Sequence, residues 1–222
     1  MISLRCDTFI KHVLDILTRS VSDIEDCIIS SVVPPVFNSV RTGVVKVIGR
    51  QPMVVGPGLK TGLNIKVEVP GQVGSDRIVI AVAALAEYEA PLLLIDMGTA
   101  TTMTVIDEGN RFLGGAIVPG VALSLNALSS GTSLLQKVPI EAPKKCISST
   151  TIECMQSGAI YGNAALLDGM IDRFQAELGC ECSLVATGGI AAKIVPHCKH
   201  KIVYDENLLL RGLGIIYRKN KH

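Results

Sequence analysis

The chain has 222 residues, of which 48% are hydrophobic and 18% charged, with a formal net charge of +1 and no tryptophan. The lack of a basic run argues against the clustered cationic face that nucleic-acid binders present. Apolar stretches are broken by Gly, Pro or charged residues before the ~18 residues that a membrane span needs. We therefore expect a soluble protein that acts on a small molecule, with neither nucleic acid nor a membrane as partner.

Seven cysteines are scattered along the chain, an odd number for a disulfide framework. The segment after Met1 carries Arg5, Asp7 and Lys11 instead of the apolar core of a secretion signal. This pattern predicts reduced thiols and a cytoplasmic location.

The first ninety residues predict two helices separated by short strands. Asp7 is a candidate N-cap for a first helix, whose apolar residues recur at helical spacing as far as Leu17. A second helix is expected to begin at Asp76 and to be buried on all sides along its apolar interior, residues 78–85. The expected strands are 27–33, which ends at Pro34-Pro35, and the shorter 44–48 and 53–55.

The residues after about Pro91 predict a mixed α/β domain. Thr150 and Glu153 have the spacing of a capping box before a long helix, and residues 107–110 have the composition of a hairpin turn. The expected elements are strands at 92–95, 103–106, 112–118 and 184–186, the long helix to about Leu178, and a final helix to about Arg218.

The segment Asp96-Met97-Gly98-Thr99-Ala100-Thr101-Thr102 places a carboxylate at the end of an apolar strand, followed by a turn rich in hydroxyl groups. Such a turn can direct N–H donors at phosphate oxygens while the carboxylate faces a cation. The alternative is a plain hairpin whose threonines bond to their own backbone. Both interpretations remain open on these residues alone.

Thr187-Gly188-Gly189 also follows an apolar strand and precedes a segment that could be helical. Glycines before a helix N-terminus form a typical site for an anion or a nucleotide, although a tight strand-to-helix connection would have the same sequence. Ligands of α/β sheets bind at the carboxyl ends of the strands, so the two turns support each other as one nucleotide site.

Gly74-Ser75-Asp76-Arg77 is the third candidate. Asp76 could simply cap its helix, or it could orient an attacking hydroxyl and accept its proton, since a helix N-terminus keeps a carboxylate ionised. In phosphoryl transfer a carboxylate of low basicity is adequate for that task. Arg77 could be a solvated charge or a bidentate partner for a carboxylate of the substrate.

A rival site consists of zinc-ligand types near the C-terminus, namely Cys180, Cys182, His197, Cys198 and His200. Their spacing, C-x-C followed by H-C-x-H, is not the usual zinc pairing. The sequence therefore favours the nucleotide site over a zinc site.

Five motifs in register resemble the type III pantothenate kinases, at that family's approximate spacing, from about residue 28 to residue 213. They are Pro57-Gly58-Leu59-Lys60-Thr61-Gly62-Leu63, Val73-Gly74-Ser75-Asp76-Arg77, Asp96 to Thr102, Gly114-Gly115-Ala116-Ile117-Val118-Pro119-Gly120, and Thr187-Gly188-Gly189. The resemblance implies an actin-like fold of two α/β domains, here residues 1–90 and 91–222, with ATP bound between them. It also implies transfer of the γ-phosphate of ATP to pantothenate, the first step towards coenzyme A.

The resemblance further implies roles for individual residues. Asp76 matches the proton acceptor, and Gly74, Ser75, Arg77 and Thr151 match the substrate-binding residues. Asp96 matches the ligand of a monovalent cation, potassium or ammonium, and magnesium accompanies ATP. Thr99 matches an ATP contact, and Gly98, Thr101, Gly188 and Gly189 complete the expected nucleotide site. The family is homodimeric, so self-association is expected as well.

Two departures from the family are visible. The family's opening Asp-x-Gly-Asn-Thr turn, which grips the ATP phosphates, does not occur in the 222 residues, so we expect an N-terminal domain without its opening strands. Ile80 and Val69 occupy positions where the family usually has Asn. The alternative to an active kinase is a non-catalytic relative that binds a ligand or a partner.

Overall fold

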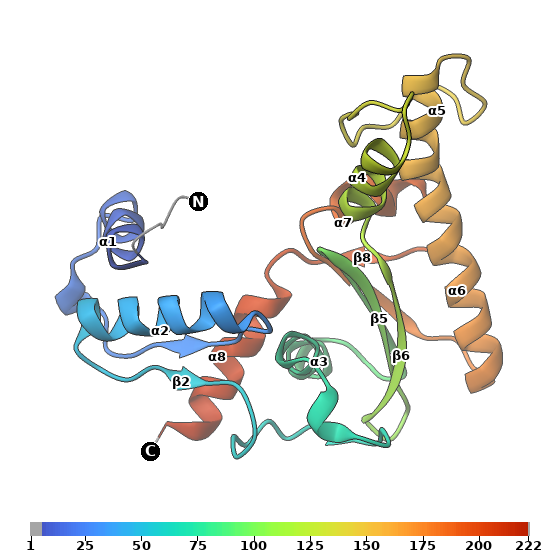
Figure 1. Cartoon of the computed structure of the whole chain (residues 1–222). Helices are drawn as coiled ribbons and strands as arrows, with labels where there is room; N and C mark the ends of the chain where they lie inside the picture. The colour runs from blue at the N-terminus through green and yellow to red at the C-terminus, as the bar shows by residue number, and fades with distance from the viewer. Residues whose placement is uncertain (1–5, 222) are drawn as a thin grey trace. The chain divides into compact units, whose positions relative to one another are not determined.

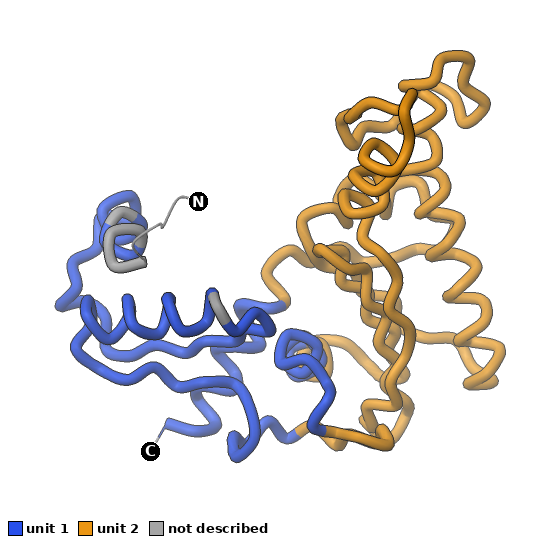
Figure 2. The backbone as a smooth tube through the Cα atoms, viewed as in Figure 1, with its two compact units in different colours: residues 1–62, 71–83, 209–222 blue, residues 63–70, 84–208 orange. Residues whose placement is uncertain are grey.

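The computed structural model describes residues 6–221 and confirms a mixed α/β protein (Figure 1). The chain forms two compact units: unit 1 comprises residues 1–62, 71–83 and 209–222, and unit 2 comprises residues 63–70 and 84–208 (Figure 2). Among the described residues, no helix combines the length and the apolar character needed to cross a bilayer. The expected halves 1–90 and 91–222 stay a prediction.

Unit 1 contains two helices that pack against each other, α1 (Cys6–Ile16) and α2 (Pro34–Ile48). Strands β1 (Ile28–Ile29) and β2 (Met53–Val54) pair in parallel, and a short 3-10 turn, η1 (Val21–Asp23), precedes them. The expected first helix and the strand at 53–55 are confirmed. The side chain of Asp7, the expected N-cap, lies outside the described side chains.

The expected strand at 44–48 is wrong, because these residues form the last turns of α2. The β-branched residues of this segment favour a strand locally, but Pro34 and Pro35 occupy the first helical positions, where a missing N–H costs nothing. Gly49, with φ 75°, ends the helix in the left-handed conformation. The expected strand 27–33 is likewise reduced to the two residues of β1.

The predicted buried helix is confirmed as α3 (Ser75–Glu87), in which Val79, Ala81 and Ala83 have no exposed surface. The final helix, α8 (Leu208–Asn220), approaches it closely within unit 1: a Cβ on Gly212 would overlap with the backbone oxygen of Val79. Only a glycine at this position therefore lets the two helices pack this closely.

We expect Gly212→Ala to destabilise the protein by about 1–3 kcal/mol, because the added methyl group forces the α3 and α8 backbones apart. Gly214→Ala is the matched control on the same helix, since its methyl would meet only the end of the flexible Arg218 side chain at 3.4 Å. Urea unfolding of both variants measures the difference. Equal stability of the two variants would contradict the close contact at Gly212.

Unit 2 is built on a six-stranded sheet in the order β3-β6-β5-β4-β7-β8. Its strands are β3 (Asn64–Ile65), β4 (Leu92–Met97), β5 (Ala100–Ile106), β6 (Arg111–Pro119), β7 (Ser183–Thr187) and β8 (Val203–Tyr204). Strands β4, β5 and β6 are antiparallel neighbours, whereas β7 runs parallel to β4, and β8 to β7. The strands predicted after Pro91 are confirmed, with small extensions at their ends.

The helices of unit 2 include the predicted long stretch to Leu178, which consists of α5, a π-helical turn η3, and α6. Its start is capped as expected, because the Glu153 N–H donates to Thr150 Oγ1 over 3.2 Å. The bounds are α4 (Val121–Gly131), α5 (Thr151–Ser157), η3 (Gly158–Gly162), α6 (Asn163–Leu178), α7 (Ala191–Ile194) and the 3-10 turn η4 (Val195–His197). A further 3-10 turn, η2 (Pro70–Gln72), precedes α3. A second helix is expected between residues 118 and 184 without defined bounds, and α4 supplies it.

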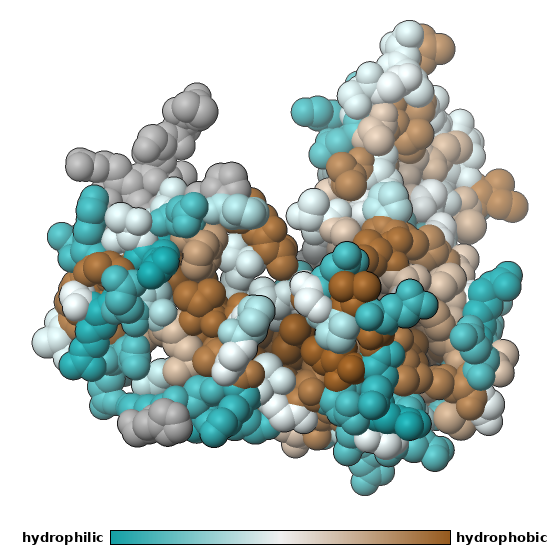
Figure 3. All heavy atoms as spheres, turned by 60° about the horizontal axis from the view of Figure 1, so that its bottom comes forward, coloured by the Kyte–Doolittle hydropathy of each residue, from teal (hydrophilic) through white to brown (hydrophobic). Residues whose placement is uncertain are grey.

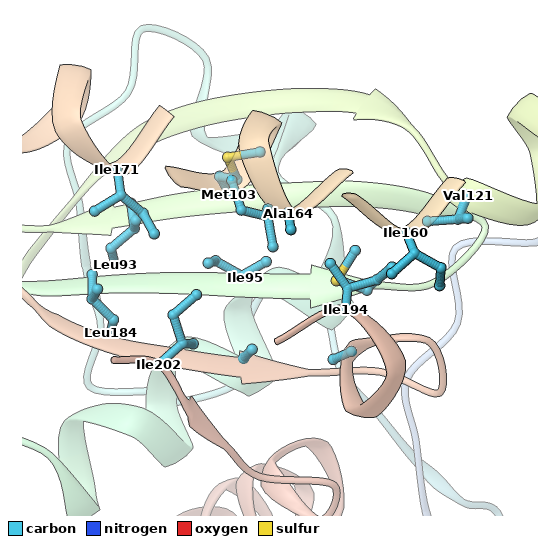
Figure 4. Packing of buried hydrophobic residues seen from close by; sticks show 14 of the residues in the cluster. Leu93, Ile95, Met103, Val121, Ile160, Ala164, Ile171, Leu184, Ile194 and Ile202 are labelled. Carbon is cyan, nitrogen blue, oxygen red and sulfur yellow. The ribbon is translucent and has the colours of Figure 1, made fainter. Parts of the chain in front are cut away.

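The core of unit 2 lies between the sheet and these helices (Figure 4). Strand residues such as Leu93, Ile95 and Met103 have no exposed surface, and they pack with Ile160 of η3 and Ile171 of α6. The opposite face of β4 is buried too, as Leu92 and Leu94 show. This packing fixes the carboxyl ends of β4 and β7, where the sequence predicts the nucleotide site.

Candidate functional site

The first candidate group lies at the start of α3, in unit 1. Within the described residues, the hydrogen bond that the structure assigns to the Asp76 carboxylate comes from the Arg77 N–H, 2.8 Å from Oδ1. A Cβ on Gly74 would collide with that same Oδ1. The glycine therefore leaves room for the carboxylate to fold back over the first turn of the helix.

Arg77 is half-buried beside this carboxylate. Burial lowers the pKa of the Arg77 guanidinium from its ordinary value, and the neighbouring Asp76 opposes this effect. The ordinary pKa is so high that the guanidinium keeps its charge at neutral pH. Residues 74–77 therefore place an acceptor of protons and a fixed cation next to each other.

A serine from another part of unit 1 joins this group. Ser30 directly follows β1, and its Oγ donates a hydrogen bond of 2.8 Å to the Oγ of Ser75. The pairing of Ser30 with Ser75 is not predictable from local sequence patterns, since 45 residues separate the two serines. The only sequence signal was its place at the carboxyl end of an apolar strand.

The second candidate group lies in unit 2, where β4 and β5 form a hairpin centred on Thr99. The register pairs Met97 with Thr101 and Asp96 with Thr102. Gly98 and Thr99 are exposed at the tip, and Asp96 is half-buried just behind it. The turn thus has the exposed backbone and the adjacent carboxylate that a phosphate and a cation would require.

The structure brings the two glycine-containing turns together. Strand β7 is the parallel neighbour of β4, with Thr187 paired to Asp96. Gly188 has φ +95°, and a Cβ there would lie 2.7 Å from the Met97 oxygen and 2.8 Å from Asp96 Oδ1. Only glycine allows the backbone to pass this close to the carboxylate. Gly189, next to it, is exposed.

The expected helix after Thr187-Gly188-Gly189 is reduced to the four residues of α7. Such a short helix has a weak dipole, since the dipole grows with the number of aligned peptide units. The feature of this turn that favours a ligand is therefore the close approach of Gly188 to Asp96, and not a helix N-terminus.

The side chain of Thr101 does not point towards this group. It is 1% exposed and shares the face of Met97, the side of the sheet that packs on the helices. Its Oγ1 is buried without a hydrogen-bond partner among the described residues. The predicted nucleotide contact of this side chain has no support in the geometry. Thr102 lies directly across from Asp96 on the same face, a placement that follows only from the strand register.

The third glycine motif supports the hairpin from β6. The Gly120 N–H donates to the Thr99 oxygen over 3.1 Å, and a Cβ on Gly120 would overlap with the backbone oxygens of Gly98 and Thr99. Gly115, with φ +144°, passes equally close to the backbone of Met103. These glycines are therefore required for strand packing around the turn.

Thr151 is the remaining predicted substrate contact. It is exposed in the first turn of α5, and its position in the sequence is well separated from both candidate groups. It lines a cavity of about 450 Å³ between α4 and α5, together with apolar side chains such as Leu125 and Met155. The size of the cavity is within the range of small-molecule sites.

The zinc alternative has no geometric support. Within residues 6–221, no group of three or more His, Cys, Asp or Glu side chains is placed to hold a metal ion. Burial, and then the charge of Asp168, raises the pKa of Cys198 to about 11, so its thiol stays protonated at neutral pH. His200 pairs with Asp172 at 2.8 Å, and His197 packs edge-on against Tyr161.

Comparison with known proteins gives a consistent result. A family model for type III pantothenate kinase matches residues 3–173. The type III pantothenate kinase of Exiguobacterium sibiricum is 44% identical over 202 residues, which cover 91% of this chain and 79% of that protein. The corresponding protein of Listeria monocytogenes is 42% identical over 200 residues, covering 90% of this chain and 77% of its own length.

A solved structure supports the fold. A conserved protein of Campylobacter jejuni, described as a transcriptional activator of the Baf family, aligns with a TM-score of 0.54 over 76% of this chain and 72% of that one. Its sequence identity is 21%, so the likeness concerns the fold alone. The family model and the closely similar kinases identify the chain itself: it belongs to the type III pantothenate kinase family.

Proposed function

We propose that this protein transfers the γ-phosphoryl group of ATP to the terminal hydroxyl of pantothenate, in the cytoplasm, as the first step towards coenzyme A. The observation that carries the proposal, beyond membership of the family, is the Asp76 carboxylate held on the first turn of α3. The related kinases of Exiguobacterium and Listeria are named for this reaction.

In the proposed reaction, unit 1 supplies the residues for the alcohol. Asp76 orients the attacking hydroxyl and accepts its proton, which a carboxylate of low basicity can do because positioning dominates phosphoryl transfer. Gly74 leaves room for the carboxylate, and Ser75 and Arg77 bind polar groups of pantothenate. Thr151, in unit 2, is proposed as a further contact with the substrate.

Unit 2 supplies the residues for the nucleotide. The exposed backbone of Gly98, Thr99 and Gly189 is proposed to donate to phosphate oxygens, and Gly188 to keep that surface open beside Asp96. Thr101 contributes to this group only through its backbone, because its hydroxyl is buried on the other face of the sheet.

Asp96 is proposed as the ligand of a monovalent cation, potassium or ammonium. Asp96 is half-buried, the Gly188 backbone passes close to its Oδ1, and Thr102 lies directly across from it on the same face with a hydroxyl oxygen. Magnesium commonly binds through one or two carboxylates and the phosphates of the substrate. We therefore assign magnesium to the ATP phosphates, where it neutralises charge that develops during transfer.

We further propose the actin-like arrangement of two halves, residues 1–90 and 91–222, and a homodimer. The support for self-association is a set of exposed apolar side chains in unit 2, on α4, α5 and the loop between them; Figure 3 shows separate brown groups at the surface of the molecule. Its exposed members are Leu123, Leu128, Leu134, Ile147 and Ile152. Exposed apolar side chains mark a contact between proteins where they form a contiguous patch.

A coupled assay of ADP release tests the proposed reaction. With magnesium and potassium present, ADP should appear only when pantothenate is added, and replacement of potassium by sodium should slow the rate. Sugars and short hydroxy acids should not replace pantothenate. If folded protein releases no ADP with pantothenate, the proposed activity is wrong, and ligand or partner binding without catalysis takes its place.

A further inference from the structure

The hydrogen bond between Ser30 and Ser75 connects the end of β1 to the first residue of α3. Both side chains are half-buried, so solvent competes only partly for the two hydroxyl groups. Val32, of the same loop, also lies near this turn, since its Cγ1 is 3.6 Å from the point where a Cβ on Gly74 would be. The loop after β1 is therefore packed on the turn that carries Asp76.

The direction of this hydrogen bond has a chemical consequence. A serine hydroxyl has one proton to donate and two lone pairs to accept with. Ser30 uses its proton on Ser75 Oγ, so the Ser75 proton is directed elsewhere and one rotamer of Ser75 is favoured. Ser75 then presents a donor on the first turn of α3, the turn that also carries Arg77, whose guanidinium can only donate as well. The ligand groups that fit these two residues are acceptor oxygens, of a carboxylate or a carbonyl.

We infer that Ser30 is a positioning residue for the alcohol substrate, which acts through Ser75 by fixing its hydroxyl as a donor to a carboxylate or carbonyl oxygen of that substrate. This inference rests on the proposed function, which makes pantothenate the substrate. Ser30 itself needs no contact with the ligand, and its effect passes through the single hydrogen bond to Ser75.

The test is a cycle of three variants, Ser30→Ala, Ser75→Ala and the double variant, with Ser31→Ala as the matched control. Ser31 is the adjacent serine of the same loop, but its Oγ accepts from the Val33 N–H at 3.2 Å and does not reach α3. We expect Ser30→Ala to raise KM for pantothenate about five-fold, the factor that an ordinary net hydrogen bond corresponds to. KM for ATP should not change, and Ser31→Ala should change neither constant.

The double variant separates positioning from a general structural role. Because Ser30 acts through Ser75, adding Ser30→Ala to Ser75→Ala should cause no further rise in KM for pantothenate. Ser30→Thr keeps the hydroxyl and should restore KM to near the wild-type value. Multiplicative effects of the two alanines, an unchanged KM in Ser30→Ala, or a Ser30→Thr variant as weak as Ser30→Ala would overturn the inference.

Calorimetric titration with pantothenate distinguishes this inference from the proposed function. If wild-type protein binds pantothenate without turnover, the proposed catalysis is wrong. The Kd for pantothenate then replaces KM as the quantity compared among the serine variants. If wild-type protein neither phosphorylates nor binds pantothenate, both proposals are overturned. Thermal unfolding of each variant shows that it is folded before its KM or Kd is compared.

Discussion

Asp76→Asn should lower kcat for the phosphorylation of pantothenate by about 10²- to 10⁴-fold, the usual contribution of a positioned acid–base group. The amide cannot accept the proton of the attacking hydroxyl. Its oxygen can still accept the hydrogen bond from the Arg77 N–H, so the first turn of α3 should remain folded. Steady-state rates of ADP release, with saturating ATP and pantothenate, measure the effect.

Asp107→Asn is the control for this substitution. Its carboxylate also accepts backbone N–H bonds, from Gly109 and Arg111, but it lies in the hairpin between β5 and β6. The Arg111 guanidinium holds the pKa of Asp107 below its ordinary value, so this group is ionised at neutral pH, as the catalytic carboxylate must be. The control should keep a near-normal kcat. An Asp76→Asn variant as fast as this control would show that the proposed proton acceptor is wrong.

Gly188→Ala should raise KM for ATP by at least about tenfold, because the added methyl group disturbs the turn beside Asp96. The residue has φ +95°, and its Cβ would lie 2.8 Å from Asp96 Oδ1. A non-glycine residue held in this conformation costs on the order of 1–3 kcal/mol, and relief of the contact displaces the turn or the carboxylate. The KM for pantothenate should change much less.

Gly169→Ala is the matched control in unit 2. This glycine lies within α6, and a Cβ there would have no atom within 4 Å. Alanine is favoured over glycine inside a helix by roughly 0.5–1 kcal/mol, so the control should be as stable as wild type or more so. Thermal unfolding and KM for ATP should be measured on both variants. If Gly188→Ala behaves like Gly169→Ala, the turn at Gly188 has no part in nucleotide binding.

The sequence predicted the parts of the fold that depend on local patterns. The strands at 92–118 have apolar runs bounded by turn residues, and the structure confirms β4, β5 and β6. The capping box of Thr150 and Glu153 marked the start of α5 correctly, because its hydrogen bond joins residues three positions apart. The burial of α3 on all sides was also predictable, since its interior carries no polar residue between Ile78 and Leu85.

The wrong predictions came from segments where tertiary packing overrides local preference. The β-branched residues of 44–48 favour a strand, but the helix that begins at Pro34 continues through them to Gly49. The proline pair was interpreted as the end of a strand, although proline is equally favoured at the first helical position. Helix α4 follows Pro119-Gly120, which also has the composition of a turn, so the bounds of this helix could not be predicted.

The candidate site was predictable in its residues but not in its geometry. The motifs around Asp76, Asp96 and Gly188 identified the family from the sequence alone. The contact of Gly188 with Asp96 depends on the parallel pairing of β4 and β7, whose partners are about ninety positions apart. The same holds for Ser30 and Ser75. The orientation of Thr101 has the same cause, because only the strand register decides that Thr102, and not Thr101, shares the face of Asp96.

Calorimetric titration of the wild-type protein with ATP, in the presence of magnesium and potassium, is the most direct test that the turns after β4 and β7 form a nucleotide site. We expect saturable binding of one ATP per chain with a Kd in the micromolar range, about −8 kcal/mol, and weaker binding when magnesium is withheld. Folded protein that gives no heat of binding with ATP at millimolar concentration would contradict the account.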